Sequence, residues 1–300
     1  MADLAILYEH PLWFRPLFAA LDTRGVDYAA IHADDHRFVP GESSPPAPLI
    51  LNRLAQSSFL RSAEHPIFYA SALFEEWERQ GATIINGGNA FAIDSSKARQ
   101  LSLIRSLGFG APATRVVHRA ADVVAAAGGL RFPIVIKANI GGSGAGIARY
   151  DNLSELKAVA AENGFPASID SVLLVQEYVP ARGGKITRIE TIGGEYLYAI
   201  DVEGGGAFDL CPADACVADG NIRLTAANPD PALIAAAERI ADTMGLDVGG
   251  IEVMIDDRDG TPRFYDINAL SNFVADPLTV LGWDPHERFV DWLQQRIGRG

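Results

Sequence analysis

Short apolar runs and longer segments with helical spacing alternate along the first third of the chain. The pattern predicts strands at residues 4–8, 28–31, 48–52 and 83–86, and helices at residues 12–24 and 68–80. A proline-rich stretch at residues 41–48 separates the second strand from the third and is typical of a loop. This order of strands and helices indicates an open α/β layer over roughly the first 95 residues.

Beyond this layer the pattern changes to smaller groups of strands. A helix capped by Asp94 or Ser95 is expected to run to Leu107, because its apolar residues recur on one face and Gly108 follows as a stop. Between residues 133 and 176 the order is strand, glycine-rich loop, strand, helix and strand. The last third predicts a hairpin of residues 186–192 and 196–202, a helix face at residues 233–244, strands at residues 250–255 and 263–267, and a final helix at residues 286–297. The chain therefore belongs to the α/β class, with α+β lobes after the first layer.

Composition and charge exclude several classes of partner. With 48% hydrophobic residues, the 300-residue chain can bury a substantial core. Its net charge of −13 argues against a nucleic-acid partner, because a phosphate backbone would be repelled. No apolar run approaches the roughly 20 residues that span a bilayer, so we expect no membrane partner. The N-terminal segment has no basic region, and we expect a cytoplasmic protein whose two cysteines are free thiols.

Residues 133–147 combine an apolar run, a lysine and a glycine-rich loop. Lys137 ends the predicted strand, and a lysine at the end of a buried strand needs a partner. The loop contains Gly141, Gly142, Ser143, Gly144 and Gly146. Residues without a Cβ let backbone N–H groups approach phosphate oxygens, but the same loop also suits a plain flexible hairpin. It lacks the Gly-Lys-Ser/Thr ending of a P-loop.

Acidic and amide side chains stand on the last two predicted strands. Glu252 interrupts an apolar strand, while Asp266 and Asn268 lie two positions apart on the next strand and so point to one face. Carboxylate and amide oxygens are ligands that Mg²⁺ uses when it also holds nucleotide phosphates. The alternative is that these side chains cap the strands by accepting nearby backbone N–H groups.

The order of these motifs resembles the ATP-grasp superfamily and, within it, the RimK-like carboxylate–amine ligases. The motifs are Lys97, Lys137, the glycine-rich loop, Gln176, Glu177, Tyr178, Val179, Arg188, Glu252, Asp266 and Asn268, preceded by residues 49–53 and 85–86 and by the turn at residues 108–114. The similarity covers nearly the whole chain. It implies an ATP-grasp fold with an N-terminal Rossmann-like domain at residues 1–95, a central lobe with a glycine-rich lid at residues 96–178, and a C-terminal lobe with the metal site at residues 179–300.

The resemblance implies a role for each motif. Lys97 and Lys137 would contact the phosphates of ATP, and the loop of Gly141, Gly142, Ser143, Gly144 and Gly146 would fold over them. Glu177 and Val179 would meet adenine through backbone groups, and Gln176 and Tyr178 would shape that pocket. Glu252, Asp266 and Asn268 would hold Mg²⁺, with Mn²⁺ as an alternative ion. Arg188 would face the γ-phosphate and, with Lys137, act in catalysis.

Two of these assignments have alternatives that are visible in the sequence. Arg188 shares a strand face with Glu190, so a structural ion pair competes with ligand contact. Lys97 stands at a helix start, where most lysines simply face the solvent.

The implied reaction is an ATP-dependent ligation. A carboxylate would take the γ-phosphate to form an acyl phosphate, and an amine would then displace the phosphate, so that ADP and phosphate are released. Both substrates would be small molecules or peptide-like, and the protein would form a homodimer or homotetramer. A small-molecule kinase would use the same nucleotide site, as would an ATP-binding regulator without turnover. The three metal ligands speak against the regulator, because nucleotide binding alone does not require them.

The chain departs from the family pattern in two regions. Lys185 and Ile186 stand where many relatives have an acidic residue near the ribose hydroxyls. Residues 208–216 replace basic and amide residues of the relatives with two thiols and two carboxylates. Two thiols without a nearby histidine do not complete a tetrahedral zinc site. We interpret this segment as a loop that lines the acceptor pocket, with ordinary loop polarity as the alternative.

The candidate substrate residues are spread over three segments. His10 and Arg15 follow the first strand, where open α/β sheets bind ligands, although packing of Trp13 and Phe14 into the core also explains this run. The others are Asp209, Cys211 and Asp214 in the loop and Asn272 just past the proposed metal ligands.

Overall fold

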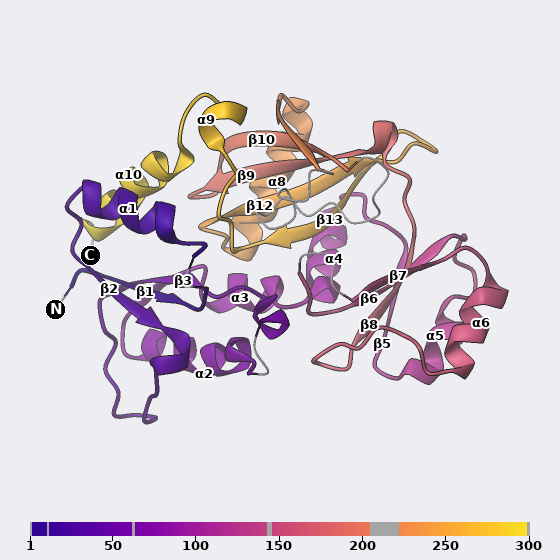
Figure 1. Ribbon diagram of the computed structural model, residues 1–300, viewed down its shortest axis with the longest axis horizontal. Coiled ribbons are helices and arrows are strands. Elements are labelled where there is room, and N and C mark those ends of the chain that lie inside the picture. Colours follow the sequence, from indigo (N-terminus) through magenta and orange to yellow (C-terminus); the bar gives the residue numbers. More distant parts are fainter. Residues whose placement is uncertain (1, 11, 62–63, 143–145, 205–221, 299–300) are drawn as a thin grey trace.

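Three β-sheets and the helices packed against them form the computed structural model, which describes residues 2–10, 12–61, 64–142, 146–204 and 222–298. Figure 1 shows the N-terminal sheet at one end of the molecule, the small middle sheet at the other, and the C-terminal sheet along the upper side between them. None of the helices in these ranges has the length and apolar character that crossing a membrane requires.

The N-terminal sheet is a parallel α/β layer, as the sequence pattern predicts. Its strands are β1 (Leu4–Tyr8), β2 (Tyr28–His32), β3 (Leu49–Arg53) and β4 (Thr83–Ile85), in the order β2-β1-β3-β4, with helices α1 (Arg15–Thr23), α2 (Pro66–Arg79) and α3 (Gly88–Asp94). Helix α1 begins three residues later than expected, because the Nδ1 atom of His10 accepts the N–H groups of Leu12 and Trp13, each at 3.2 Å, and holds a turn there. The pattern did not predict α3.

Asn86 joins the N-terminal sheet to the C-terminal sheet. It leaves β4 in the left-handed region (φ 54°), which asparagine tolerates better than most residues. Its side-chain oxygen accepts the N–H groups of Asp247 and Val248, and its Nδ2 donates to the carbonyls of Val248 and Ala269 at 2.6 Å each. Every polar atom of this fully buried amide is therefore used to hold the two sheets together.

The middle sheet is antiparallel and carries the glycine-rich loop. It is preceded by α4 (Lys97–Ser106), and its elements are β5 (Thr114–Val117), α5 (Val123–Ala126), β6 (Ile134–Ala138), β7 (Ile147–Tyr150), α6 (Leu153–Ala161) and β8 (Leu173–Glu177), with strand order β5-β8-β6-β7. The cap of helix α4 lies one to two residues later than expected, because Ser96 is the residue whose side chain accepts the N–H of Arg99.

The C-terminal sheet has one apolar and one polar face. Its elements are β9 (Lys185–Ile192), β10 (Glu195–Glu203), β11 (Arg223–Ala227), α8 (Pro231–Met244), β12 (Val248–Ile255), β13 (Pro262–Asn268), α9 (Pro277–Val280) and α10 (Pro285–Ile297), with strand order β11-β10-β9-β12-β13. The predicted hairpin turn is confirmed, since Gly193 and Gly194 both have positive φ. The pattern did not predict β11 or α9.

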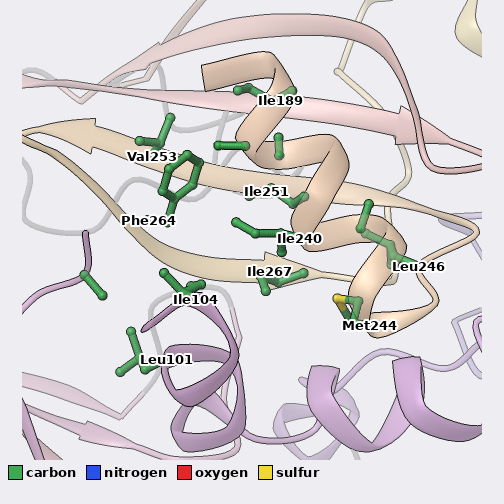
Figure 2. Packing of buried hydrophobic residues seen from close by; sticks show 14 of the residues in the cluster. Leu101, Ile104, Ile189, Ile240, Met244, Leu246, Ile251, Val253, Phe264 and Ile267 are labelled. Atoms are coloured by element: carbon green, nitrogen blue, oxygen red, sulfur yellow. The ribbon is translucent and has the colours of Figure 1, made fainter. Parts of the chain in front are cut away.

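Helices α8 and α4 cover the apolar face of this sheet. Ile189, Ile251 and Ile267 come from three adjacent strands and pack with Ile240 of α8, while Leu101 and Ile104 of α4 close the cluster from below (Figure 2). Because alternate strand residues face opposite ways, this core leaves the residues between them on the other face.

Asp256 ties the end of β12 to the exit of the middle sheet. Its fully buried carboxylate accepts hydrogen bonds from Nε and Nη2 of Arg258, both at 2.7 Å, and Arg258 also lies 3.8 Å from Glu177 at the end of β8. Asp257 donates its N–H to the carbonyl of Pro180 at 2.9 Å. The hydrogen bonds from Arg258 lower the pKa of Asp256 from its usual 3.8 to about 2.

We predict that Asp256→Asn lowers the free energy of unfolding by about 2 kcal/mol at pH 7, because the ionised carboxylate is favoured by the fold. A carboxyl group whose pKa is lower in the folded protein stabilises the fold at pH values above its unfolded-state pKa. This stabilisation is lost as the pH falls through the folded-state pKa. The difference between wild type and variant should therefore persist at pH 5 and fall by about half at pH 3 in urea unfolding. Asp291→Asn, which breaks the exposed 2.6 Å pair with Arg24, serves as the control with a loss of at most about 1 kcal/mol. A pH-independent loss for Asp256→Asn would contradict the assignment.

Candidate functional site

A row of charged side chains crosses the polar face of the C-terminal sheet. Arg188 on β9 lies opposite Glu252 on β12, and Glu252 lies opposite Asp266 on β13. Residues directly opposite each other on antiparallel strands project from the same face, so the three side chains are neighbours. Asn268 follows on the same face two residues after Asp266. The structure thus brings together the arginine and the three predicted metal ligands.

A β-bulge adds a fourth side chain to this row. The pairing of β12 with β13 shifts between Glu252 and Val253, which leaves Tyr265 as the extra residue on β13. A bulge turns two consecutive side chains toward one face. The hydroxyl of Tyr265 donates to Oε2 of Glu252 at 2.7 Å. Simple alternation places Tyr265 on the opposite face, so the sequence pattern gave no signal for this contact.

Arg188 contacts three side chains of the site. Its Nε donates to Oε1 of Glu190 at 2.6 Å, its Nη1 to Oε1 of Glu252 at 3.2 Å, and its Nη2 to Oγ of Ser271 at 3.4 Å. Burial would lower the pKa of Arg188, but the carboxylates of Glu190 and Glu252 outweigh it and raise the pKa. The ion pair between Arg188 and Glu190 that the sequence offered as an alternative is therefore present, alongside a second pair with Glu252.

Gly250 makes room for the guanidinium of Arg188. A Cβ atom at this position would lie 2.4 Å from Nε and 2.6 Å from Cζ of Arg188. Glycine in a strand interior is ordinarily less stable than alanine, and here the close approach of the arginine explains it.

Lys97 reaches the row from the start of α4. Its Nζ forms an ion pair with Oδ1 of Asp266. Burial would lower the pKa of Lys97, but Asp266 and then Glu252 raise it, so the ammonium stays charged. Conversely, burial and the nearby charge of Asp266 raise the pKa of Glu252, against the opposing effect of Arg188. Two crowded carboxylates are thus held together by two cations, and Lys97 is not a surface lysine.

The residues present fit a magnesium ion that also binds phosphates. Glu252, Asp266 and Asn268 supply carboxylate and amide oxygens from two adjacent strands on one face. Among the described residues, no group of three or more histidine, cysteine or acidic side chains is arranged to hold a metal ion without further ligands of another kind. Mg²⁺ is usually bound by one or two carboxylates and keeps its other positions for water and substrate phosphates, so a partial ligand set is what it requires.

The glycine-rich loop starts beside this row. Lys137 near the end of β6 extends its Nζ to 5.5 Å from the ring centre of Tyr265. Asn139 fixes the start of α4 against the same segment, because its Oδ1 accepts the N–H of Ala98 at 2.9 Å. Gly142 lies against the N-terminal layer, where a Cβ would be 2.8 Å from Cβ of Ser57, and Gly146 has a positive φ of 73°. Gly141 is partly buried, whereas Ser143 and Gly144 lie outside the described residues.

The predicted adenine segment, residues 176–179, connects the middle sheet to the C-terminal one. Gln176 is buried and its Nε2 donates to Oγ1 of Thr114 at 2.9 Å, and Val179 is buried as well. The carboxylate of Glu177 accepts the N–H of Arg131 at 2.9 Å. The guanidinium of Arg149 lies 4.5 Å from the ring centre of Tyr178.

The candidate substrate residues are not gathered at one point. His10 stacks on Trp13 at 4.3 Å and uses Nδ1 for the local turn, while Arg15 is exposed at the start of α1. Asn272 is partly buried beside Phe273, whose φ of 60° is unusual for an aromatic residue. Asp209, Cys211 and Asp214 lie outside the described residues. Lys185 and Ile186 stand where many relatives have an acidic residue near the ribose hydroxyls. Lys185 pairs with Asp201, and Ile186 is buried.

Asp94 at the end of α3 was expected only as a helix cap, but its carboxylate contacts the residue that follows β13. Its carboxylate accepts the N–H of Ala269 at 2.9 Å and Nε2 of Gln56 at 2.8 Å. Burial raises the pKa of Asp94 to about 6, against the effect of these hydrogen bonds. The signal in the sequence was weak, because a single aspartate before a helix is ordinarily a cap.

Comparison with known proteins identifies relatives of the chain. The family model for the RimK-like ATP-grasp domain matches residues 94–275. A probable alpha-L-glutamate ligase of Pseudoalteromonas atlantica is 29% identical over 191 residues, which are 62% of this chain and 60% of that protein. A ribosomal protein bS6–L-glutamate ligase of Escherichia fergusonii is 25% identical over 244 residues, 76% of this chain and 73% of that protein.

Solved structures share the fold. D-cycloserine synthetase DcsG superposes with a TM-score of 0.73 at 20% identity, covering 98% of this chain and 99% of that one. The ATP-grasp ligase PsnB complexed with a minimal precursor superposes with a TM-score of 0.71 at 17% identity, covering 98% of this chain and 99% of that one.

We predict that Gly250→Ala lowers the free energy of unfolding by about 1–3 kcal/mol, because the new methyl group displaces the guanidinium of Arg188. In an Arg188→Ala background the same change should cost much less, since the colliding atoms are gone. A double-mutant cycle followed by urea unfolding measures this coupling, which we expect to exceed about 1 kcal/mol. Additive losses would contradict the role of Gly250.

Proposed function

Because the chain belongs to the RimK-like ATP-grasp family of ATP-dependent carboxylate–amine ligases, we propose that the charged row on its C-terminal sheet carries out such a ligation. The products would be an amide, ADP and phosphate. The chain would divide into three lobes, with boundaries near residues 95 and 178. The charged row, on the third lobe, would lie between the glycine-rich loop of the second lobe and the N-terminal layer.

Support comes chiefly from the juxtaposition of two carboxylates, two cations and a glycine-rich loop. Arg188, Glu252 and Asp266 stand side by side, and Lys97 contacts the last of them. Each charge in this group is buried or nearly so, which is costly unless a charged ligand or partner is present. A nucleotide triphosphate with its metal ion is such a ligand, because its phosphate oxygens suit the two cations and its metal ion suits the two carboxylates.

The nucleotide would lie between the middle and C-terminal sheets. Lys137 and Lys97 would offer positive charge to its phosphates, and Gly141, Gly142, Ser143, Gly144 and Gly146 would cover them. Adenine would meet residues 176–179 at the junction, where Gln176 and Val179 are buried. Lys97 would exchange its contact with Asp266 for a phosphate oxygen.

Glu252, Asp266 and Asn268 would hold Mg²⁺, or Mn²⁺ in its place. The bound ion would neutralise phosphate charge and so favour attack on the γ-phosphorus. Tyr265 would keep Glu252 in position through its 2.7 Å hydrogen bond.

Arg188 would stabilise the transferring phosphoryl group. A carboxylate oxygen of the acid substrate attacks the γ-phosphorus, the bond to the bridging oxygen breaks, and ADP leaves. The amine nitrogen then attacks the acyl carbon, phosphate departs, and the nitrogen loses a proton. A guanidinium with a raised pKa remains positive throughout and can pair with the phosphate oxygens at both stages.

The substrates are proposed as an acid and an amine of amino-acid or peptide-like character. The named relatives include ligases for L-glutamate. His10, Arg15, Asp209, Cys211, Asp214 and Asn272 remain candidates for contacts with them.

The test is to incubate the purified protein with ATP, Mg²⁺, pooled carboxylates and hydroxylamine, and to follow ADP and hydroxamate. Hydroxamate formation coupled to ADP supports a ligase that forms an acyl phosphate. A stable phosphorylated product instead would indicate a kinase, and ATP binding without turnover would indicate a regulator.

We predict that Asp266→Asn and Glu252→Gln each reduce ADP formation by on the order of 10²-fold or more, because each removes a negative ligand of the metal. Circular dichroism should show an intact fold. Asp122→Asn, which breaks an exposed pair with Arg119 remote from the row, is the control and should retain full activity. Retained activity in Asp266→Asn would sink the assignment of the metal site.

A further inference from the structure

Strand β13 is the last strand of the C-terminal sheet, so only one side of its main chain pairs with another strand. Alternate residues of a strand turn their N–H and C=O groups toward opposite sides. Ile267 and Ala269 turn theirs toward the open side, where side chains from other elements bond to all four groups. The proposed metal ligands Asp266 and Asn268 alternate with these two residues, so whatever holds the open side also holds the ligands.

Gln100 of α4 pairs with Ile267 much as a neighbouring strand would. Its Oε1 accepts the N–H of Ile267 at 3.1 Å, and its Nε2 donates to the carbonyl of the same residue at 2.8 Å. The side chain of Gln100 is only 2% exposed, and a buried amide costs free energy unless it is hydrogen-bonded. An apolar side chain would fill the same space but leave both main-chain groups of Ile267 unpaired. The amide is therefore explained by these two bonds rather than by packing.

Asp94 and Asn86 hold the second open residue, Ala269. Oδ1 of Asp94 accepts the N–H of Ala269 at 2.9 Å, and Nδ2 of Asn86 donates to its carbonyl at 2.6 Å. Asp94 is itself tied to α4, because Nε2 of Gln100 also donates to the main-chain carbonyl of Asp94 at 3.2 Å. Asn86, Asp94 and Gln100, here called the edge clamp, thus take the place of a further strand beside β13.

The edge clamp and Lys97 act on β13 from the same helix. Lys97 precedes Gln100 by three residues, so the two side chains lie on one face of α4. Lys97 forms an ion pair with the side chain of Asp266, while Gln100 holds the main chain of Ile267, the next residue. A shift of β13 relative to α4 would therefore disturb both contacts.

We propose that Gln100 and Asp94 are positioning residues of the metal site, which fix the main chain of β13 so that Asp266 and Asn268 keep their spacing from Glu252. Neither residue contacts the ion. This inference rests on the proposed function and adds to it the means by which the chain selects its metal ion.

Fixed ligands favour Mg²⁺ over Ca²⁺. Mg²⁺ demands near-ideal octahedral geometry with oxygens at about 2.1 Å, whereas Ca²⁺ accepts oxygens at about 2.4 Å in more flexible arrangements. Ligands on a strand that can shift would adapt to the larger ion, and ligands on a strand held at both sides would not. The edge clamp therefore makes the site selective for the smaller ion.

The test measures by calorimetry the affinity of a non-hydrolysable ATP analogue for the protein, with saturating Mg²⁺ and with saturating Ca²⁺. The two ions carry the same charge, so a general loss of folding or of negative charge weakens both forms alike, and the ratio of affinities reports the geometry of the site. We expect wild type to prefer the Mg²⁺ form. Gln100→Leu keeps the bulk but removes both bonds to Ile267. It should weaken binding of the Mg²⁺ form by about 10-fold, as loss of groups that support metal ligands does, and binding of the Ca²⁺ form by much less.

A second pair of variants tests the proposal even if Gln100→Leu does not fold. Asp94→Ala removes the acceptor of the Ala269 N–H and should also lower the preference for Mg²⁺. Asp94→Asn keeps an acceptor oxygen, and the unused Oε1 of Gln56, whose Nε2 lies 2.8 Å from Asp94, can accept the new amide N–H. It should therefore keep the wild-type preference, even if both metal forms bind more weakly.

Arg105→Gln is the control on the same helix. Nη2 of Arg105 donates to the main-chain carbonyls of Ala111 and Pro112 rather than to β13. The variant should keep the preference for Mg²⁺ even if its unfolding temperature falls.

The proposal is overturned if folded Gln100→Leu or Asp94→Ala keeps the wild-type preference and loses only stability, as residues that merely satisfy the edge of a sheet would do. It is also overturned if wild type binds the Mg²⁺ and Ca²⁺ forms equally. Failure of the ligase proposal is separately visible, because binding of the analogue requires no turnover. A clear preference for Mg²⁺ without formation of hydroxamate would count against the ligase alone.

Discussion

The contact of Arg188 with Glu190 and Glu252 is the interaction on which the rest of the site depends. The polar face of the C-terminal sheet carries three neighbouring carboxylates, of which Glu190 and Glu252 are buried and Asp266 is partly buried. Their mutual repulsion would be severe without cations between them. Arg188 sits in the space left by Gly250 and forms ion pairs with Glu190 and Glu252, and Lys97 pairs with Asp266. A triphosphate with its metal ion can enter such a site because the charges are already arranged around it.

This arrangement is held by the opposite face of the same sheet. Ile189, Ile251 and Ile267 pack against α8 and α4, and each stands next in sequence to a residue of the charged row (Figure 2). A slip of one residue between strands would bury the charges and expose the apolar side chains, so the core fixes the register on which the site relies. Asn86 then fixes the N-terminal layer to this sheet with four hydrogen bonds.

Much of the site could be predicted, because it follows from local rules. Strand alternation placed Arg188 with Glu190 and Asp266 with Asn268, and the order of motifs along the chain linked them to Lys97 and Lys137. Three features could not be foreseen. The bulge at Tyr265 depends on how β13 pairs with β12, the start of α1 depends on the ring of His10, and the hydrogen bonds of Asn86 depend on the packing of two sheets. Each is decided by contacts between segments, which periodicity within one segment does not contain.

The central claim is that the charged row binds the triphosphate and its metal ion. The most direct measurement is a crystal structure of the protein with Mg²⁺ and a non-hydrolysable ATP analogue. The account predicts the ion at about 2.1 Å from oxygens of both Glu252 and Asp266, with Lys97 turned from Asp266 to a phosphate. A nucleotide bound elsewhere, or bound here with the pair of Lys97 and Asp266 intact and no ion between the carboxylates, would contradict it.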